Sequence, residues 1–244
     1  MSQQKSTPIP RCQRCGRLAA ETDKFCAECG NFLRDAWTDR RLLLSLSQER
    51  EGNSRDAQRD LERLLDIEPD NVLANHILGT FYFHQGMLDR AIDRYERAVR
   101  SEPKFVLAHY DLGVACYHRG NMKAAAAAFR DCLSIDPDYK AAHYRLALSL
   151  FHLGQLEEAL EHFQQSMILT PEYLMAHYHM GVIYERRGDL DAAAREFEKS
   201  LAEAVGEVSS IYHLALIRRQ RGDIKGAEQL LQRAEEFAAA KALS

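Results

Sequence analysis

Four cysteines near the amino terminus form two Cys-x-x-Cys pairs. Cys12 pairs with Cys15 and Cys26 with Cys29, ten residues separate the two pairs, and a glycine follows each of them. A two-residue gap lets one tight turn present two sulfurs to the same ion, and four thiolates form a tetrahedral ligand set for zinc. The spacing therefore predicts one structural Zn2+ ion held by these four cysteines.

Residues 11–34 resemble the minimal zinc ribbons that head many bacterial proteins, since the gap between the pairs is shorter than in larger fingers. The same ligands could hold iron or act as redox pairs. These alternatives are less favoured because a thioredoxin-type motif needs a βαβ context and no iron-sulfur cluster spacing occurs. We expect residues 1–10 to be disordered. The ribbon should pack against the helices that follow, because the linker is short and contains Phe32 and Leu33.

Ten histidines raise the alternative of a second metal site or a catalytic centre. Two triplets recur at one constant interval: His84, His118 and His152, and His109, His143 and His177. Equivalent residues on successive helices lie roughly 8 to 10 Å apart, whereas zinc ligands bind at about 2 Å. We therefore expect no shared metal, packing for the second triplet and a polar surface for the first. A pH-sensitive surface stays open as an alternative, because histidine titrates near neutrality.

The remainder of the chain repeats with one constant period. Glycines mark the period at Gly52, Gly86, Gly120, Gly154, Gly188 and Gly222. An alanine follows each glycine by five residues, and an aromatic residue or leucine follows the alanine by four. Glycine ends a helix in a left-handed conformation, alanine allows close approach of a second helix, and the large residue fills the space between them. Each unit is thus predicted to be a pair of helices.

These columns resemble the tetratricopeptide repeat (TPR) family, including its characteristic repeat length. The second unit shows the pattern best, with Asn75, Leu78, Gly79, Tyr82, Ala91, Tyr95, Ala98 and Pro103. The resemblance implies an all-α fold in residues 36–244, a right-handed superhelical solenoid of about six helix-turn-helix repeats behind the zinc ribbon. The repeats are expected at about 38–71, 72–105, 106–139, 140–173, 174–207 and 208–241. The family's frequent tryptophan is missing, and the fifth unit lacks a closing proline.

The resemblance also implies that the first helix of each pair lines a concave groove that binds a peptide or protein segment. Helical spacing assigns to this groove His76, Phe83, His84, Tyr110, Tyr117, His118, Tyr144, Phe151, His152, Tyr178 and Tyr212. Tyrosine suits such a surface because it offers a large contact area with a polar tip. The alternative for the tyrosine column is packing between neighbouring helices.

Composition narrows the function classes further. A formal net charge of −4 gives no whole-molecule field for nucleic acid or an anionic membrane. No apolar run approaches the roughly 18 residues of a membrane span, and residues 1–10 do not read as a signal peptide. We therefore expect a cytoplasmic protein without membrane insertion. The sequence motifs of phosphate-binding loops, dinucleotide sites, zinc proteases and serine hydrolases are absent, which disfavours an enzyme.

Together these patterns predict a non-catalytic scaffold or adaptor for protein-protein interaction, with a structural or docking zinc ribbon. The alternative is a regulatory or nucleic-acid-binding factor whose ribbon makes the recognition while the repeats recruit other proteins. Salt dependence separates the two, because binding to phosphates weakens steeply with salt. The sequence does not define the partner or the oligomeric state.

Overall fold

The computed structural model describes residues 54–169, 174–203 and 208–242. All regular secondary structure in these ranges is α-helical, which confirms the all-α prediction for this part of the chain. Residues 1–53 lie outside the described ranges. The four cysteines of the predicted zinc ribbon and the first helix of the first predicted repeat therefore lie outside them too.

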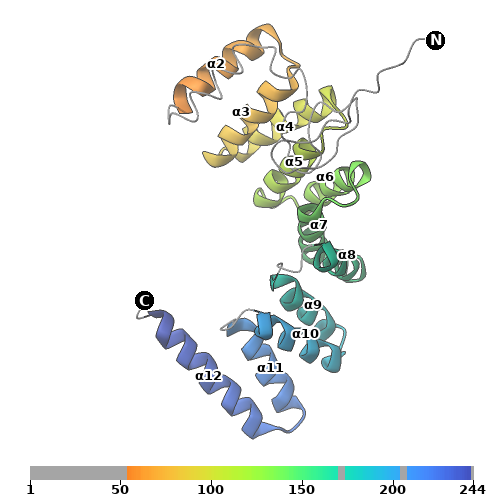
Figure 1. Ribbon diagram of the computed structural model, residues 1–244, viewed down its shortest axis with the longest axis vertical. Coiled ribbons are helices and arrows are strands. Elements are labelled where there is room, and N and C mark those ends of the chain that lie inside the picture. Colours follow the sequence, from red (N-terminus) through yellow and green to blue (C-terminus); the bar gives the residue numbers. More distant parts are fainter. Residues whose placement is uncertain (1–53, 170–173, 204–207, 243–244) are drawn as a thin grey trace, which may run out of the picture. The chain divides into compact units, whose positions relative to one another are not determined.

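The helices follow one another as short hairpins (Figure 1). They are α2 (Ser54–Ile67), α3 (Val72–His84), α4 (Leu88–Ser101), α5 (Val106–His118), α6 (Met122–Ile135), α7 (Lys140–His152), α8 (Leu156–Leu169), α9 (Leu174–Arg186), α10 (Leu190–Glu203), α11 (Val208–Gln220) and α12 (Ile224–Ala242). We call α3, α5, α7, α9 and α11 the first helices and the helix after each of them a second helix. Each first helix has 13 residues, and α12, with 19 residues, exceeds the 14 of the other second helices.

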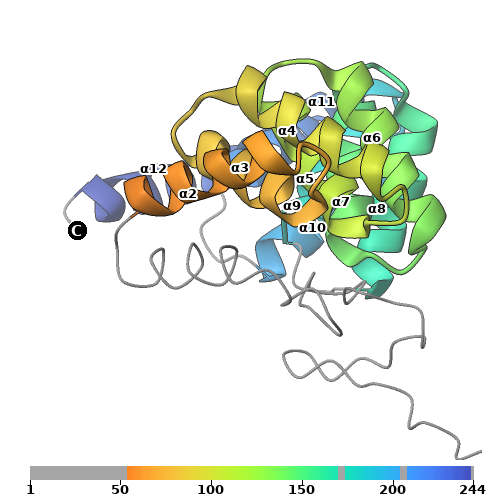
Figure 2. The same cartoon turned by 90° about the horizontal axis from the view of Figure 1, so that it is seen from above.

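The chain divides into two compact units, residues 1–149 and 150–244, which we call unit 1 and unit 2. In unit 1, α2 packs on α3, α3 on α4, α4 on α5 and α5 on α6 (Figures 1 and 2). The largest side chains of its core are fully buried, among them Leu61, Tyr95 and Phe129. In unit 2, α9 to α12 pack in the same succession, and Phe197 is buried at the centre. A column of large residues, one on each of α2, α4, α6, α8 and α10, is thus fully buried among the helices.

The turns inside the hairpins end the first helices in the same way. Gly86, Gly120, Gly154, Gly188 and Gly222 have φ between 74° and 84°. At the first of them, the Met87 amide donates to the Tyr82 carbonyl at 2.9 Å and the Gly86 amide donates to the Phe83 carbonyl at 2.9 Å. A bond across six residues with glycine in the left-handed region is a Schellman ending, which satisfies helix carbonyls that would otherwise lack partners.

Replacing Gly120 by alanine is expected to lower the free energy of unfolding by about 1 to 2 kcal/mol, the cost of a Cβ in the left-handed region. Apart from Gly120 and its two chain neighbours, no atom lies within 4 Å of the position of that Cβ, so the loss is one of backbone conformation alone. Gly120→Asn should lose less, because asparagine tolerates this region better. Urea unfolding followed by circular dichroism measures both variants. Equal losses for alanine and asparagine would contradict this reason.

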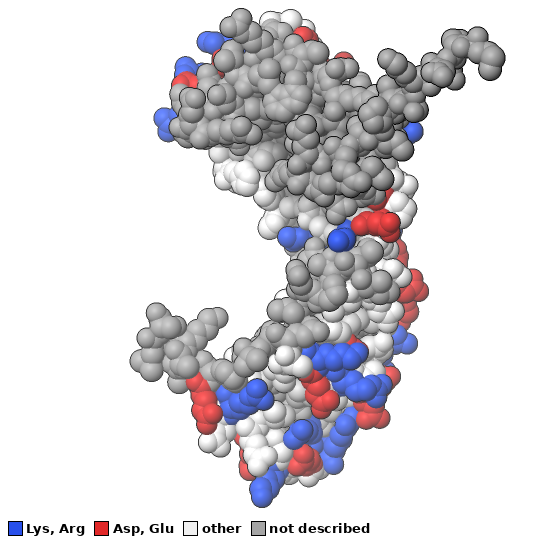
Figure 3. Space-filling view, viewed as in Figure 1, with Lys and Arg blue, Asp and Glu red and all other residues white. Residues whose placement is uncertain are grey.

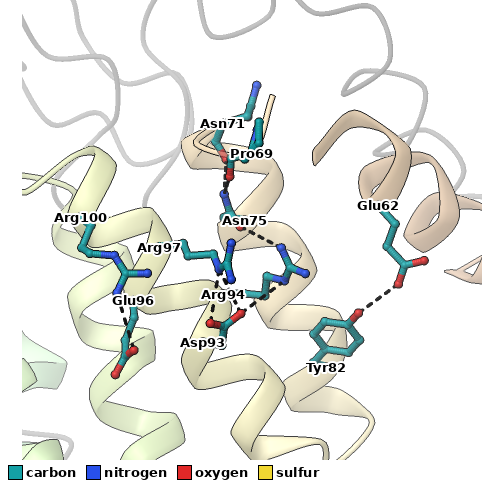
Figure 4. A network of polar contacts seen from close by, with 10 residues as sticks. All are labelled: Glu62, Pro69, Asn71, Asn75, Tyr82, Asp93, Arg94, Glu96, Arg97 and Arg100. Atoms are coloured by element: carbon teal, nitrogen blue, oxygen red, sulfur yellow. Dashed lines mark hydrogen bonds and ion pairs between the residues drawn. The ribbon is translucent and has the colours of Figure 1, made fainter. Parts of the chain in front are cut away.

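Polar side chains fasten the first repeats of unit 1 to each other (Figure 4). The Tyr82 hydroxyl on α3 donates to Glu62 Oε1 on α2 at 3.0 Å. The Asn75 amide donates to the Pro69 carbonyl at 2.8 Å, and Arg94 donates to Asn75 Oδ1 at 3.4 Å. Burial, followed by the hydrogen bond to Glu62, raises the pKa of Tyr82. Asn75 therefore holds the segment that closes the preceding repeat.

Candidate protein-binding surface

The second histidine triplet lies where Asn75 lies in the second repeat. The ring Nε2 atoms of His109 and His143 donate to the carbonyls of Pro103 and Pro137, at 3.0 and 2.8 Å. His177 instead meets Glu196 of α10, with Nδ1 2.6 Å from Oε2. These rings are buried and hold the backbone between repeats, or one helix of a pair to the other. In the described ranges, no group of three or more His, Cys, Asp and Glu side chains is arranged to hold a metal ion.

The column expected to supply groove tyrosines is largely engaged between helices. His76 is buried, and its ring packs against Phe105 at 4.9 Å between centroids. Tyr110 is partly buried against Phe129 and Tyr139 at 5.8 and 5.2 Å. Two further members, Tyr144 and Tyr178, are also partly buried.

Tyr212 differs from the rest of this column. It lies on α11, the last of the described first helices, and 47% of its surface is exposed. The structure therefore places most of the column in the contacts between helices and leaves its last member open to solvent.

Near the carboxyl ends of the first helices, aromatic rings alternate with exposed imidazoles. In unit 1, the rings of Phe83 and His118 lie edge to face at 5.5 Å, and His118 lies beside Tyr117 at 6.0 Å. His84 packs on Phe83 in the same manner at 5.8 Å. The two imidazoles are exposed and the two aromatic rings are partly buried. We call these four residues the aromatic row of unit 1.

Unit 2 carries a similar set on α7 and α9. The Phe151 ring lies 5.8 Å from that of His152, which is exposed. Arg186 takes the position that His118 has in unit 1, with its guanidinium carbon 4.6 Å from the centroid of Phe151. A guanidinium over a ring is attracted by the negative face of the ring. In both units an aromatic ring of one repeat is thus bordered by a cationic or titratable side chain of the next.

One functional column was missed by sequence reasoning: Asp111, Arg145, His179 and His213, which recur at the repeat interval on the first helices. We call it the bridging position. His213 of α11 stacks on Phe197 at 4.8 Å, and its Nδ1 lies 2.8 Å from Glu185 Oε2 on α9. His179 likewise stacks on Phe163 at 5.3 Å.

Asp111 shows that a carboxylate can take the same position. Its Oδ2 lies 2.8 Å from His76 Nε2. Burial of Tyr95 raises the pKa of that residue, and the charge of Asp111 raises it further. On α5, α9 and α11 the side chain at this position thus contacts the preceding repeat. The signal in the sequence was a polar residue next to each tyrosine of the predicted groove.

Burial against Phe163 and Phe151 lowers the pKa of His179 to about 4, and nearby His152 adds to the effect. His179 is therefore neutral in the folded chain at pH 7. An unfolded histidine takes up its proton near pH 6.5. Between these two values the unfolded chain binds a proton that the folded chain does not, so stability falls as the pH falls.

The chain should consequently lose about 2 to 3 kcal/mol of unfolding free energy through His179 between pH 7.5 and pH 4.5. His179→Phe keeps a stacked ring and removes the titration, so its advantage over the parent chain should grow by that amount on acidification. His118→Phe, at an exposed imidazole, is the matched control and should follow the parent chain. Urea unfolding at the two pH values measures all three. A constant difference between His179→Phe and the parent chain would show that the ring is not desolvated.

The charged surface of unit 2 is mixed in sign. On the face shown in Figure 3, its lysines and arginines are interspersed with aspartates and glutamates. Some are paired, as in the contact of Arg221 with Asp191. A phosphate backbone favours a continuous stripe of positive charge, and this face has none.

Helix hairpins of constant length, a glycine ending and a bridging residue at a fixed interval define a helical-repeat protein. Models of the tetratricopeptide repeat match residues 50–111, 85–140, 139–202 and 178–242. Together the matches run from residue 50 to residue 242. The chain belongs to the tetratricopeptide repeat family.

Solved structures of low sequence identity share this fold. MamA from Desulfovibrio magneticus RS-1 is 20% identical, with a TM-score of 0.66 over 69% of this chain and 96% of that one. YrrB, described as a TPR protein with an unusual peptide-binding site, is 19% identical, with a TM-score of 0.64 over 72% and 91%. PilF of Pseudomonas aeruginosa is 17% identical, with a TM-score of 0.63 over 82% and 96%. These likenesses support a TPR-like helical architecture.

No curated protein sequence matches the chain significantly. In the part of the chain that the structure describes, no helix combines the length and the apolar character that a membrane crossing requires.

Proposed function

We propose that this chain is a non-catalytic adaptor that binds a peptide or protein segment along its first helices. The observation that carries the proposal is the pairing of aromatic rings with exposed imidazole or guanidinium groups in both units. Partly buried aromatic residues supply contact area at low entropic cost, and the polar groups beside them orient a ligand. Such a surface suits an extended or helical segment with apolar anchors and acidic or polar neighbours.

The aromatic row of unit 1 is the part of this surface with the best defined geometry. Phe83 and Tyr117 are fixed by their own helices, and the exposed rings of His84 and His118 border them. A ligand that inserts an apolar side chain between these rings would be met by two imidazole donors. We propose the concave groove of the TPR solenoid as the setting of this contact and the cytoplasm as its place in the cell.

The test replaces the exposed imidazoles only, so that the fold is spared. Affinity capture compares the intact chain with His84→Ala/His118→Ala/His152→Ala. A matched control, Arg100→Ala/Lys123→Ala/Glu157→Ala, changes three exposed side chains of second helices. Proteins bound by the intact chain and the control should be lost from the histidine variant. Equal capture by all three would place recognition elsewhere.

We further propose that Cys12, Cys15, Cys26 and Cys29 hold one zinc ion and that the ribbon is a structural or docking element. The support is the donor set itself, four thiolates in two close pairs. The purified chain should contain about one zinc per chain by elemental analysis. Serine at Cys12 and Cys15 should remove it. Iron in place of zinc, or metal retained by the variant, would contradict this proposal.

A chain that begins at Asp35 separates the two elements in the same capture experiment. Partners kept by this shortened chain and lost from the histidine variant belong to the groove. Partners that show the opposite pattern belong to the ribbon. If their capture by the intact chain also falls steeply with salt, the ribbon binds nucleic acid.

A further inference from the structure

The last repeat exposes positions that the preceding repeats cover. The bridging residue His213 of the sixth repeat contacts three residues of the fifth repeat, Tyr178, Glu185 and Phe197, which occupy what we call the host positions. The equivalents of these three host positions, one repeat later, are Tyr212, Arg219 and Leu231. No described helix follows α12, which lies beside α11 at the carboxyl end of unit 2 (Figure 1). The host positions of the last repeat therefore lack a bridging residue among the described ones.

The exposed fractions show how open this end is. Phe197 is 0% exposed, whereas Leu231 in the same column is 37% exposed. Tyr212 and Leu216, one turn apart on α11, are 47% and 52% exposed. We call Tyr212, Leu216, Arg219, Glu228, Leu231 and Glu235 the end face. Its apolar residues Tyr212, Leu216 and Leu231 stand at positions that contact the next repeat elsewhere in the chain.

The chemistry of the missing bridging residue can be read from the covered repeats. His76 in a host position is met by the carboxylate of Asp111, and Glu185 in a host position is met by the imidazole of His213. In these two repeats the bridging residue thus complements its host. In the last repeat the hosts are a tyrosine hydroxyl and the guanidinium of Arg219, both donors. Their complement is a carboxylate.

The other edge of the end face has the opposite charge. Ala194 and Leu201 of α10 pack on the core of unit 2. Their equivalents on α12 are Glu228 and Glu235, which are exposed. A helix that covers the end face would therefore place apolar residues at its centre and basic residues along the edge near α12.

We propose that the end face binds an amphipathic helix of a partner protein, with an aspartate or glutamate in the middle of its apolar side and a lysine or arginine facing α12. The site is separate from the aromatic rows of the proposed function. The described first helices of a second copy do not supply this chemistry. Among its described first helices, only α5 carries an acid at the bridging position, and that helix already covers the second repeat.

The probe is a stapled, fluorescein-labelled helix that copies residues 208–220 with two changes. His213→Asp supplies the carboxylate. Ser210→Lys supplies the basic edge, because the hydroxyl of Ser210 donates to Ser200 of α10 at 3.0 Å and so marks the side that faces the second helix. The staple on the solvent side keeps the short peptide helical. The control peptide retains His213 and carries only the lysine.

Fluorescence anisotropy with the full chain should show binding of the aspartate peptide and binding of the histidine peptide weaker by about tenfold or more. Arg219→Glu should reverse the order of the two peptides, and Leu216→Glu should weaken both. The altered side chains are exposed, so the fold should be unchanged by circular dichroism.

Three results would overturn the proposal: no measurable binding of the aspartate peptide, binding indifferent to Arg219→Glu and Leu216→Glu, or binding lost from the His84→Ala/His118→Ala/His152→Ala chain and kept by the end-face variants. The last result would assign the peptide to the aromatic rows and leave the adaptor function in place.

Discussion

Replacing Phe129 by alanine is expected to lower the free energy of unfolding by about 3 to 5 kcal/mol. The side chain is fully buried at the centre of unit 1. Its ring contacts Tyr110 of α5 at 5.8 Å between centroids, and the backbone of Gly113 lies directly against it. Alanine would leave a cavity between the two helices that the rigid hairpin cannot close.

Lys123→Ala, at an exposed position of the same helix, is the control and should change stability by less than about 0.5 kcal/mol. Urea unfolding followed by circular dichroism measures both variants. A loss below about 1 kcal/mol for Phe129→Ala would mean that the hairpin collapses into the cavity, contrary to the close packing described here.

The second large effect is expected from Gly113→Val. A Cβ at Gly113 would lie 2.6 Å from Cε1 of Phe129, closer than carbon atoms approach in proteins. The branched side chain of valine adds two further methyl groups at the contact. We expect a loss of about 1 to 3 kcal/mol or more from overpacking.

The repeats themselves indicate how this strain is relieved. Ala147 occupies the equivalent position in the fourth repeat, and Ala215 stands opposite Leu231 in the sixth. Gly113→Ala should therefore cost little, since the gain in helix propensity of about 1 kcal/mol offsets a small shift of the ring.

In a Phe129→Leu background, Gly113→Val should cost less than in the parent chain, with a coupling energy of about 1 kcal/mol or more. A double-mutant cycle of the four chains by urea unfolding measures this coupling. Strict additivity would show that the valine clashes with something other than the ring of Phe129.

The adaptor proposal and the end-face proposal use different residues of the same architecture. Groove binding depends on the rings near the carboxyl ends of the first helices, where imidazoles are exposed in both units. The end face depends on the last described repeat, for which we propose a bridging residue from a partner protein. The chain could then hold two partners at once, which is the property that defines an adaptor.

The sequence by itself determined the helix pairs and their turns. The spacing of glycine, alanine and a large residue is a local pattern, because the helix period and the left-handed turn depend on residues that are neighbours along the chain. The structure shows positive φ at five of these glycines, and the large residue is buried on α2, α4, α6, α8 and α10. The same local spacing placed Phe83, Tyr117 and Phe151 near the carboxyl ends of the first helices.

Only the tertiary structure decided what each first-helix side chain does. Helical spacing assigns Tyr110 to a face of α5, but the ring of Tyr139 takes up part of that face. Spacing likewise could not show that His109 holds a proline carbonyl or that His213 stacks on Phe197. These roles depend on which atoms the neighbouring repeat brings within a few ångströms. That distance is set by the packing of whole helices, and the pattern along any one of them does not contain it.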